Sequence, residues 1–345
     1  MERIQKLVEA IKNGKKIGPR VVMISPTDRC NLNCKTCWRM NKNQGEFERG
    51  LSLDKINEIL GDCKDLGVNR IDFTGGGEPF FRDDIFEMIG IAKDYGFEIS
   101  LTSNGTLLDE SKIRKLVELG LDEILFSLDG LKETNDYIRG EGVFDKVIDV
   151  VEKYRKMDNN ATVGFSTVLT SKNLSELSKL VKLTDGLDLD YHNFSVLNVW
   201  KSNEFLSLEN MKEGQIYEQL KKSEKILEGS SVGSNLGKII EYGVFDKKPP
   251  RFCFAPWEMA FINASGDVMV CCTLASYYKN LLGNVKEKSF RSIWNGEKIE
   301  EFREEMKKRN FQKRCRECLP DFIDEYNDIY EEMSSKYEFE GKKDL

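Results

Sequence analysis

Residues 20–37 have the sequence RVVMISPTDRCNLNCKTC, in which a short apolar segment leads straight into a loop with three cysteines. Cys30, Cys34 and Cys37 follow a C-x3-C-x2-C spacing. Iron–sulfur clusters are held by soft thiolates, normally four for each cluster. Three thiolates in one loop can therefore bind three irons of a 4Fe-4S cluster and leave the fourth iron open to another ligand.

A structural zinc site is the alternative for these three thiols. Zinc sites of that kind take four nitrogen or sulfur ligands, usually in two separated pairs. No fourth ligand lies near the loop in the sequence, and the single histidine, His192, is far along the chain. The spacing thus favours an iron–sulfur cluster.

Composition narrows the class of protein. A chain of 345 residues is long enough for one large domain and a smaller one. Its net charge is −7, with Lys and Arg interspersed among acidic residues, so we expect no nucleic-acid partner. Nine cysteines without an apolar N-terminal signal favour metal or redox chemistry over disulfides and predict a cytoplasmic protein. No apolar run is long enough to span a bilayer, so no membrane association is expected.

Strand-like and helix-like segments alternate over the first two hundred residues or so. The patterns predict strands over 20–25, 70–74, 98–102, 123–128, 161–169 and 190–197, and helices over 52–66, 83–95, 109–119, 143–157 and 174–183. Six such units predict an α/β fold with a parallel sheet, a partial (β/α)6 barrel of the TIM type. The site is then expected on the loops that follow the strands.

We expect five regions along the chain. They are a helical extension over 1–19, the partial barrel over 20–200, connecting helices over 201–250, a small α+β cluster domain over 251–320 and an acidic helix or tail over 321–345. Within the fourth region, residues 257–272 predict a hairpin that turns at 264–267, and a helix is expected near 290–308.

A second motif, Phe73-Thr74-Gly75-Gly76-Gly77-Glu78-Pro79, follows the second predicted strand. Consecutive glycines allow a backbone to approach a ligand closely. The Glu78 carboxylate can accept hydrogen bonds from an ammonium group. A plain glycine-rich turn between strand and helix is the alternative.

Together, the cysteine loop and the Gly-Gly-Glu-Pro stretch resemble the radical S-adenosylmethionine (SAM) superfamily. The resemblance implies that the amino and carboxylate groups of SAM chelate the open iron of a 4Fe-4S cluster. An electron from the cluster then splits SAM to give a 5′-deoxyadenosyl radical, which takes a hydrogen atom from the substrate. It also implies a reducing partner such as flavodoxin or ferredoxin.

The resemblance also implies SAM contacts after the second, third and fourth predicted strands. The residues are Gly76, Gly77, Glu78, Pro79, Asn104, Ser127, Asp129 and, further along the chain, Arg139. The Gly-Gly-Glu-Pro stretch matches the family's motif for the methionine amino group. Ser127 is expected at the ribose or carboxylate, Asp129 at the cofactor or substrate, and Arg139 at the SAM carboxylate or, alternatively, in a surface salt bridge. An aromatic residue often precedes the third cysteine in this family, whereas Thr36 has that place here.

The C-terminal cysteines resemble the SPASM domain, which binds auxiliary iron–sulfur clusters in many radical SAM enzymes. The fuller pattern has seven cysteines, whereas five follow residue 250 in this chain. One auxiliary 4Fe-4S cluster is expected, bound by Cys253, Cys271, Cys315 and Cys318. Adjacent strand residues face opposite ways, so Cys272 is expected to be spare. It is then a buried small apolar residue or a hydrogen-atom donor to a substrate radical.

Three kinds of function fit these features. The first is an enzyme that oxidises or epimerises a small sugar-like or aminoglycoside-like substrate. The second modifies a peptide or protein by a cross-link, an epimerisation or formylglycine formation. The third is a non-catalytic electron-transfer or cluster-carrier protein, which does not need the Gly-Gly-Glu-Pro stretch. Only 29 residues precede Cys30, fewer than the leader-binding domain of many peptide maturases, which favours the small molecule.

Overall fold

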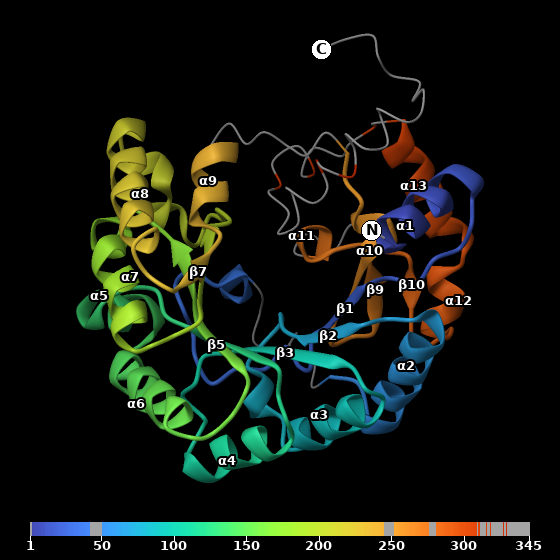
Figure 1. Cartoon of the computed structure of the whole chain (residues 1–345), viewed down its shortest axis with the longest axis horizontal. Coiled ribbons are helices and arrows are strands. Elements are labelled where there is room, and N and C mark those ends of the chain that lie inside the picture. The colour runs from blue at the N-terminus through green and yellow to red at the C-terminus, as the bar shows by residue number, and fades with distance from the viewer. Residues whose placement is uncertain are drawn as a thin grey trace.

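The computed structural model describes residues 2–41, 50–244, 252–275 and 281–308, together with residues 310, 315, 318, 327 and 329. In this part of the chain one sheet has the strand order β10-β9-β8-β1-β2-β3-β4-β5-β6-β7. Figure 1 shows that the sheet is curved and that helices α2 to α8 surround its outer side.

Six parallel strands form the barrel portion, as predicted. They are β1 (Val21–Ile24), β2 (Arg70–Phe73), β3 (Glu98–Ser103), β4 (Glu123–Ser127), β5 (Thr162–Leu169) and β6 (Tyr191–Val196), each paired with the next. The helices between them are α2 (Leu53–Leu66), α3 (Ile85–Asp94), α4 (Glu110–Glu118), α5 (Lys132–Arg139), α6 (Val143–Arg155) and α7 (Leu177–Gly186). The α/β partial barrel is therefore confirmed, and α5 is a helix that the sequence patterns did not predict.

Local sequence signals explain the bounds of these helices. The Ser52 side chain accepts a hydrogen bond from the Lys55 amide at the start of α2, and Gly67 ends that helix at a φ of 75°. Its apolar stripe, Ile56, Ile59, Leu60 and Cys63, is buried, which confirms that Cys63 belongs to the core.

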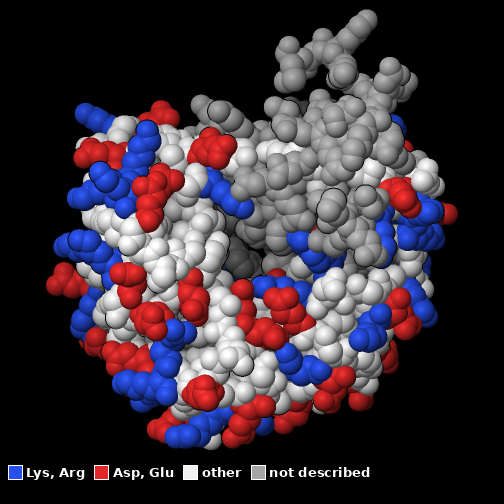
Figure 2. Space-filling model, in the orientation of Figure 1, with Lys and Arg blue, Asp and Glu red and all other residues white. Residues whose placement is uncertain are grey.

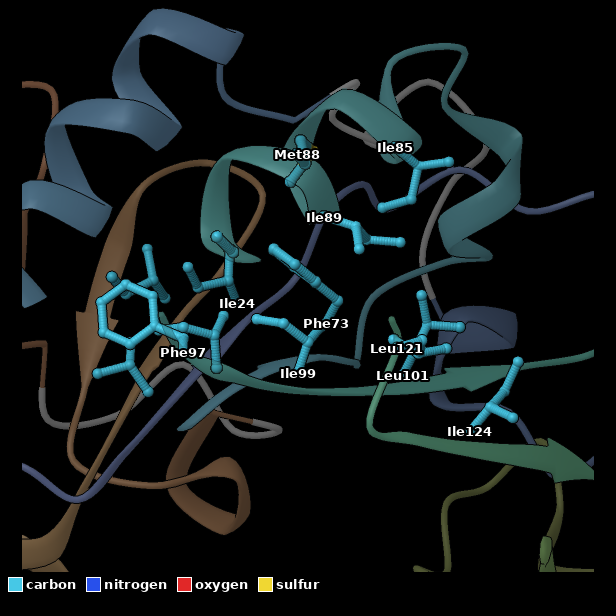
Figure 3. Packing of buried hydrophobic residues seen from close by; sticks show 14 of the residues in the cluster. Ile24, Phe73, Ile85, Met88, Ile89, Phe97, Ile99, Leu101, Leu121 and Ile124 are labelled. Carbon is cyan, nitrogen blue, oxygen red and sulfur yellow. The ribbon is translucent and has the colours of Figure 1, made fainter. Parts of the chain in front are cut away.

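The main core lies between the sheet and its outer helices. Figure 3 shows apolar side chains of β1 to β4, among them Phe73, Ile99, Leu101 and Ile124, beside Ile85, Met88 and Ile89 of α3. Because side chains alternate along a strand, these residues leave the opposite, inner face of the sheet to more polar neighbours.

Beyond β6 the sheet gains a short seventh parallel strand. The segment expected to hold connecting helices contains α8 (Glu213–Leu227) and α9 (Leu236–Tyr242), but also β7 (Gly233–Ser234), which pairs with β6. The Asn235 side chain donates to the Phe194 carbonyl and accepts from the Phe194 amide, both at 2.8 Å. This amide group thus pairs with the exposed edge of β6 where β7 ends.

The C-terminal unit is joined to the barrel by the sheet itself. Its elements are α10 (Ala255–Glu258), β8 (Met259–Ile262), β9 (Asp267–Met269), α11 (Cys272–Ala275), β10 (Gly283–Asn284), α12 (Phe290–Trp294) and α13 (Glu297–Lys307). The predicted β8–β9 hairpin is present, and β8 also pairs in parallel with β1. The unit that was expected as a separate small domain therefore continues the barrel sheet, because β1 has an edge that needs a partner.

Two further elements complete the described chain. The helix predicted near 290–308 is divided at Asn295 and Gly296 into α12 and α13. At the N-terminus α1 (Glu2–Asn13) packs against the C-terminal unit, in a cluster of Leu7, Val8, Ile11, Phe252, Phe254, Trp257, Met306 and Ile329. Residues 245–250 and, apart from Asn327 and Ile329, the expected tail over 321–345 lie outside the described residues. Within the described ranges no helix is both long and apolar enough to cross a bilayer.

Candidate cluster and cofactor site

The cysteine loop follows β1, the central strand between the barrel and the C-terminal unit. Cys30, Cys34 and Cys37 are all half-buried. The Cys37 amide donates to the Cys34 carbonyl at 3.0 Å, and the Leu32 amide donates to the Cys30 sulfur at 3.4 Å. These hydrogen bonds fold the loop into a compact turn. Because the loop follows β1, its three thiols lie at the carboxyl end of that strand.

Burial controls the protonation of these thiols. It raises the pKa of Cys30 and Cys37 and raises the pKa of Cys34 to about 12. Burial is the largest cause of the raised pKa of Cys34; the neighbouring Arg139 guanidinium lowers this pKa, and interaction with Cys37 and Cys30 contributes to raising it. Without metal the thiols are therefore neutral at pH 7, and a metal cluster that binds them must displace protons.

The arrangement of donors suits a cluster. In the described part of the chain no three Cys, His, Asp or Glu side chains converge as ligands of one metal ion would. Each iron of a cluster takes a single protein thiolate, so thiols that serve a cluster need not meet at one point. The charge interactions among Cys30, Cys34 and Cys37 show that the three are neighbours. Three soft, neighbouring thiols, with no fourth ligand among the residues that the structure describes, fit a 4Fe-4S cluster with one open iron.

Arg39 is a site residue that the sequence patterns missed. Its side chain is buried, and its guanidinium donates to the Leu32 carbonyl at 3.3 Å. Its positive charge lowers the pKa of Cys30 and of Cys37. Only its position two residues after Cys37 could have drawn attention to it.

The glycine motif packs against the cysteine loop. The Gly77 amide donates to the Thr27 carbonyl at 2.6 Å, and the Glu78 amide donates to the Arg29 carbonyl at 2.8 Å. A Cβ at Gly77 would lie 1.8 Å from the Arg29 carbonyl oxygen. A Cβ at Gly76, whose φ is 64°, would lie 2.1 Å from the Ser25 hydroxyl. Because these glycines have no side chains, the glycine motif can pack closely against the backbone segment that leads to Cys30.

Glu78 is buried and largely occupied by protein donors. It accepts hydrogen bonds from the Ser103 hydroxyl at 2.7 Å, the Asn104 amide at 2.7 Å and the Phe80 amide at 3.2 Å. The Phe80 bond caps a single 3-10 turn that begins at Pro79. Burial raises the pKa of Glu78, and these hydrogen bonds lower it. A carboxylate has about four acceptor positions, and described protein donors fill three of them at Glu78.

Asn104 connects the end of β3 to the first cysteine. Its side-chain nitrogen donates to the Asn31 side chain at 3.0 Å and lies 3.7 Å from the Cys30 sulfur. Its side-chain oxygen accepts from the Thr106 amide at 2.9 Å. The Thr-Ser-Asn-Gly turn is therefore a support for the cluster loop.

Asp129 and Arg139 form a buried ion pair behind the loop. The Arg139 guanidinium donates to the Asp129 carboxylate at 2.9 Å, and that carboxylate also accepts from the Val168 amide at 2.8 Å. The Thr36 hydroxyl lies 3.5 Å from the same carboxylate. The Arg139 side chain is only 10% exposed, so the alternative of a surface salt bridge is wrong. Its Nε is buried without a hydrogen-bond partner among the described residues, which leaves a donor for an anionic group.

Neutral polar side chains form a row on the inner face of β4 to β6. The register aligns Ser127 with Ser166, and Ser166 with Asn193. Their strand neighbours, such as Phe165 and Phe194, are buried on the helix side, so the row faces inward. All three side chains are half-buried, and none makes a hydrogen bond to another residue that the structure describes.

His192 is part of the core and not of this row. Its two ring nitrogens lie 2.8 Å from the Thr167 hydroxyl and 2.7 Å from the Thr184 hydroxyl of α7. Its ring stacks on Phe194 at 4.1 Å between centroids. Burial lowers the pKa of His192 to about 3, so the ring is neutral at pH 7. His192 is therefore a buried core residue.

The auxiliary cysteines also lie near one another. Burial raises the pKa of Cys253 to about 12, and the charges of Cys315 and Cys318 raise it further. Burial raises the pKa of Cys271, and interaction with the nearby Cys272, Cys318 and Cys253 contributes to raising it. The Cys318 sulfur lies 3.4 Å from the Thr273 hydroxyl. Strand β9 ends at Met269, and Cys272 begins α11 and is half-buried. The expectation that Cys271 and Cys272 are adjacent strand residues is therefore wrong, because the chain turns into a helix at this point.

The fold and the site together define a partial barrel with an open three-thiolate cluster site and an appended cysteine-rich unit. Residues 24–184 match the model of the radical SAM superfamily, and residues 253–319 match that of an iron–sulfur cluster-binding domain, SPASM. The chain belongs to the radical SAM superfamily and carries a C-terminal SPASM domain. Its domains imply a 4Fe-4S cluster that binds SAM and auxiliary iron–sulfur binding.

Two curated relatives are similar over most of their length. The tungsten-containing aldehyde ferredoxin oxidoreductase cofactor-modifying protein of Pyrococcus furiosus is 28% identical over 301 residues, 80% of this chain and 81% of that protein. The AdoMet-dependent heme synthase of Methanosarcina barkeri is 27% identical over 318 residues, 87% of this chain and 88% of that protein.

Among solved structures, Streptococcus suis SuiB bound to S-adenosylmethionine has a similar fold. The TM-score is 0.68 at 17% sequence identity, over 88% of this chain and 72% of SuiB. SuiB has also been solved with the precursor peptide SuiA. At this identity the likeness concerns the fold.

Proposed function

We propose that this protein is a radical SAM enzyme that takes a hydrogen atom from a small, uncharged, hydroxyl-bearing substrate. The sugar-like class of substrate is the leading candidate, with oxidation or epimerisation as the outcome. The observation that carries this proposal is the inward row of Ser127, Ser166 and Asn193, three neutral side chains that make no hydrogen bond to any other described residue. The two curated relatives, whose names concern a cofactor and heme, also favour a small molecule.

Cys30, Cys34 and Cys37 hold the first cluster in this proposal. When bound, the cluster and SAM supply a one-electron cleavage that gives a 5′-deoxyadenosyl radical. Arg39 and Arg139 place positive charge beside the thiolates. Thiolate ligation and buried positive charge are the means by which a protein sets the potential of such a cluster.

The chain's own groups then position SAM. The remaining acceptor position of Glu78 takes the ammonium group, and the free Nε–H of Arg139 donates to the carboxylate. In this proposal the backbone at Gly76, Gly77 and Pro79 positions Glu78 against the cysteine loop. The Asn104 side chain positions the part of the loop that carries Cys30. Ser127 is the nearest member of the polar row to Asp129 along the chain and is proposed to contact the ribose.

Charge on the inner face favours a neutral substrate. Arg139 is paired with Asp129. A substrate against the polar row therefore meets neutral donors and acceptors, which suit hydroxyl groups better than carboxylates.

A peptide is the second candidate, since SuiB, of similar fold, has been solved with a precursor peptide. A peptide amide also suits serine and asparagine side chains. The two candidates can be distinguished by the kind of substrate, small molecule or peptide, that increases the rate of 5′-deoxyadenosine formation above the slow rate measured without substrate.

The test is an anaerobic screen with reconstituted protein, SAM and a reductant. We expect uncharged polyols or sugars deuterated at carbon to increase 5′-deoxyadenosine formation and to transfer deuterium into it. Ser166→Ala and Asn193→Ala should each raise KM for such a substrate about tenfold, because each removes a hydrogen bond, while the substrate-free rate is unchanged. Stimulation by peptides alone would establish the second candidate, and no 5′-deoxyadenosine at all would overturn both.

The auxiliary site is proposed to bind one 4Fe-4S cluster through Cys253, Cys271, Cys315 and Cys318, with Cys272 as a possible hydrogen-atom donor in an epimerase. Cys272→Ala should then keep about eight irons and still cleave SAM. In an epimerase this variant should lose turnover, because the substrate radical is no longer quenched. In a dehydrogenase it should stay active. A loss of about four irons would instead exchange the roles of Cys271 and Cys272.

A further inference from the structure

Two lysines flank one exposed aromatic ring on the surface behind the cluster loop. Tyr137 of α5 is 45% exposed. The Lys35 ammonium lies 3.7 Å from the centroid of its ring, and the Lys172 ammonium lies 5.1 Å from it. We call these three residues the basic aromatic patch. They come from the cysteine loop, from α5 and from the turn after β5, so the fold assembles the patch from three separate segments.

The patch lies directly behind a proposed cluster ligand. The Lys35 amide donates to the Ile138 carbonyl at 2.8 Å, and the Lys35 ammonium donates to the Tyr137 carbonyl. The Cys34 sulfur is 4.0 Å from the Arg139 carbonyl oxygen, at the end of the same helix. Cys34 and the patch therefore contact the same last turn of α5, so only the loop and this helix end lie between the thiol and the patch.

The charge of the patch is not neutralised within the described chain. Neither Lys35 nor Lys172 forms a salt bridge with a described residue, whereas nearby Lys132 contacts the carboxylates of Asp136 and Asp145. Over the face drawn in Figure 2, basic and acidic side chains are interspersed. Two cations that no described carboxylate pairs therefore lie beside one exposed tyrosine. Tyrosine is also enriched at the centres of protein interfaces.

We propose that the basic aromatic patch is the docking surface for an acidic one-electron carrier protein of the flavodoxin or ferredoxin class. This inference rests on the proposed function, which needs an electron at the cluster. One electron leaves the reduced carrier and enters the cluster on Cys30, Cys34 and Cys37. The carrier is oxidised by one electron and the cluster is reduced by one, with no bond made or broken.

Charge complementarity argues for this occupant. Carboxylates around the redox centre of such a carrier would meet Lys35 and Lys172, and opposite charges steer the encounter of two proteins. Tyr137 supplies a rigid apolar contact between the two charges. The short path from the patch to Cys34 makes the same surface suitable for electron transfer.

The test compares two double variants with equal change in charge. Lys35→Glu/Lys172→Glu reverses the patch, and Lys221→Glu/Lys222→Glu reverses two exposed lysines of α8 as the control. Binding of an acidic flavodoxin is measured by calorimetry in low and high salt. We expect the patch variant to weaken Kd by about tenfold or more in low salt and to lose most of the salt dependence. The control variant should bind as the wild type does.

Electron transfer provides the second readout. Stopped-flow reduction of the cluster by reduced flavodoxin should slow about tenfold in the patch variant, while reduction by photoreduced 5-deazariboflavin, which is uncharged, should not change. Lys172→Glu alone, on a segment separate from the cysteine loop, is the variant to use if Lys35→Glu lowers iron content. Equal Kd values for wild type, patch variant and control would overturn the docking proposal. Failure of deazariboflavin-reduced wild type to cleave SAM would instead overturn the proposed function.

Discussion

At the scale of single residues, the site is built from buried polar groups that share one another's hydrogen-bonding capacity. Glu78 illustrates the point, since three protein donors already point at its carboxylate. Asp129 likewise accepts from Arg139 and from the Val168 amide. Groups of this kind hold a loop rigidly because an unmade hydrogen bond in a buried place is costly. The geometry of the site and the stability of the fold therefore depend on the same side chains.

Glu78→Gln tests this double role. The amide replaces one acceptor oxygen with a donor, which then faces the donors of Ser103, Asn104 or Phe80. We expect the variant to lose about 1–3 kcal/mol of unfolding free energy and to bind SAM more weakly. Chemical denaturation and SAM titration of the reconstituted protein measure the two effects. The exposed Glu133→Gln is the matched control and should change neither. Wild-type stability together with wild-type SAM affinity would remove Glu78 from the site.

His192 makes stability depend on pH. In the unfolded chain its ring takes a proton near pH 6.5, whereas burial lowers the pKa in the folded protein to about 3. The unfolded state thus binds more protons between these values, so stability falls as pH decreases from about 6.5 toward 3. At pH 5 the contribution lost is about 2 kcal/mol. His192→Gln removes this titration, and its stability should fall less between pH 7 and pH 5. Identical losses for variant and wild type would contradict the assignment.

At the scale of elements, glycine-rich packing joins the second strand–helix connection to the cysteine loop. Gly77 has no room for a side chain, because the Arg29 carbonyl oxygen lies 1.8 Å from where its Cβ would be. The turn after β3 supports the same loop through Asn104 and Asn31. The loop that carries the thiols is therefore positioned by its neighbours and not by its own sequence alone.

Gly77→Ala should displace the cysteine loop. We expect it to lower iron content from about eight to about four per chain, since only the auxiliary site is left intact. Gly214→Ala in α8 is the control, because a Cβ there meets nothing within 4 Å. That variant should keep its iron and gain about 0.5–1 kcal/mol from helix propensity. Normal iron content in Gly77→Ala would show that the loop does not need this contact.

The sequence predicted the elements with strong periodicity and missed those set by context. The six barrel strands and the Ser52 cap follow from local patterns. Helix α5 was missed because its apolar positions are few, and β7 because its two residues carry no strand pattern. The roles of Arg39, and of Glu78 as a hub for three donors, depend on segments that meet only in the folded chain.

At the scale of the whole molecule, barrel and C-terminal unit are one structure. β8 pairs with β1 over four residues, and Ile262, Phe290 and Trp294 belong to the same core as the barrel strands. The chain length predicted one large unit and a smaller one, and the sequence contained no signal for the shared sheet. The two cluster sites are thereby held on a common frame.

Removal of residues 251–345 should therefore prevent folding of the barrel. The truncated chain leaves the edge of β1 unpaired and exposes the apolar surface that Ile262 and Trp294 cover. We expect it to be insoluble or to lack a cooperative thermal transition. A soluble 1–250 chain that melts cooperatively and binds about four irons would show that the barrel is an independent domain.

Iron and acid-labile sulfide content tests the central claim most directly. We expect about eight irons per chain in the anaerobically reconstituted wild type and about four in the variant in which Cys30, Cys34 and Cys37 are all replaced by Ala. A wild type that saturates at about four irons would contradict the auxiliary site. A triple variant that still binds about eight would contradict the assignment of the SAM-binding cluster to the cysteine loop.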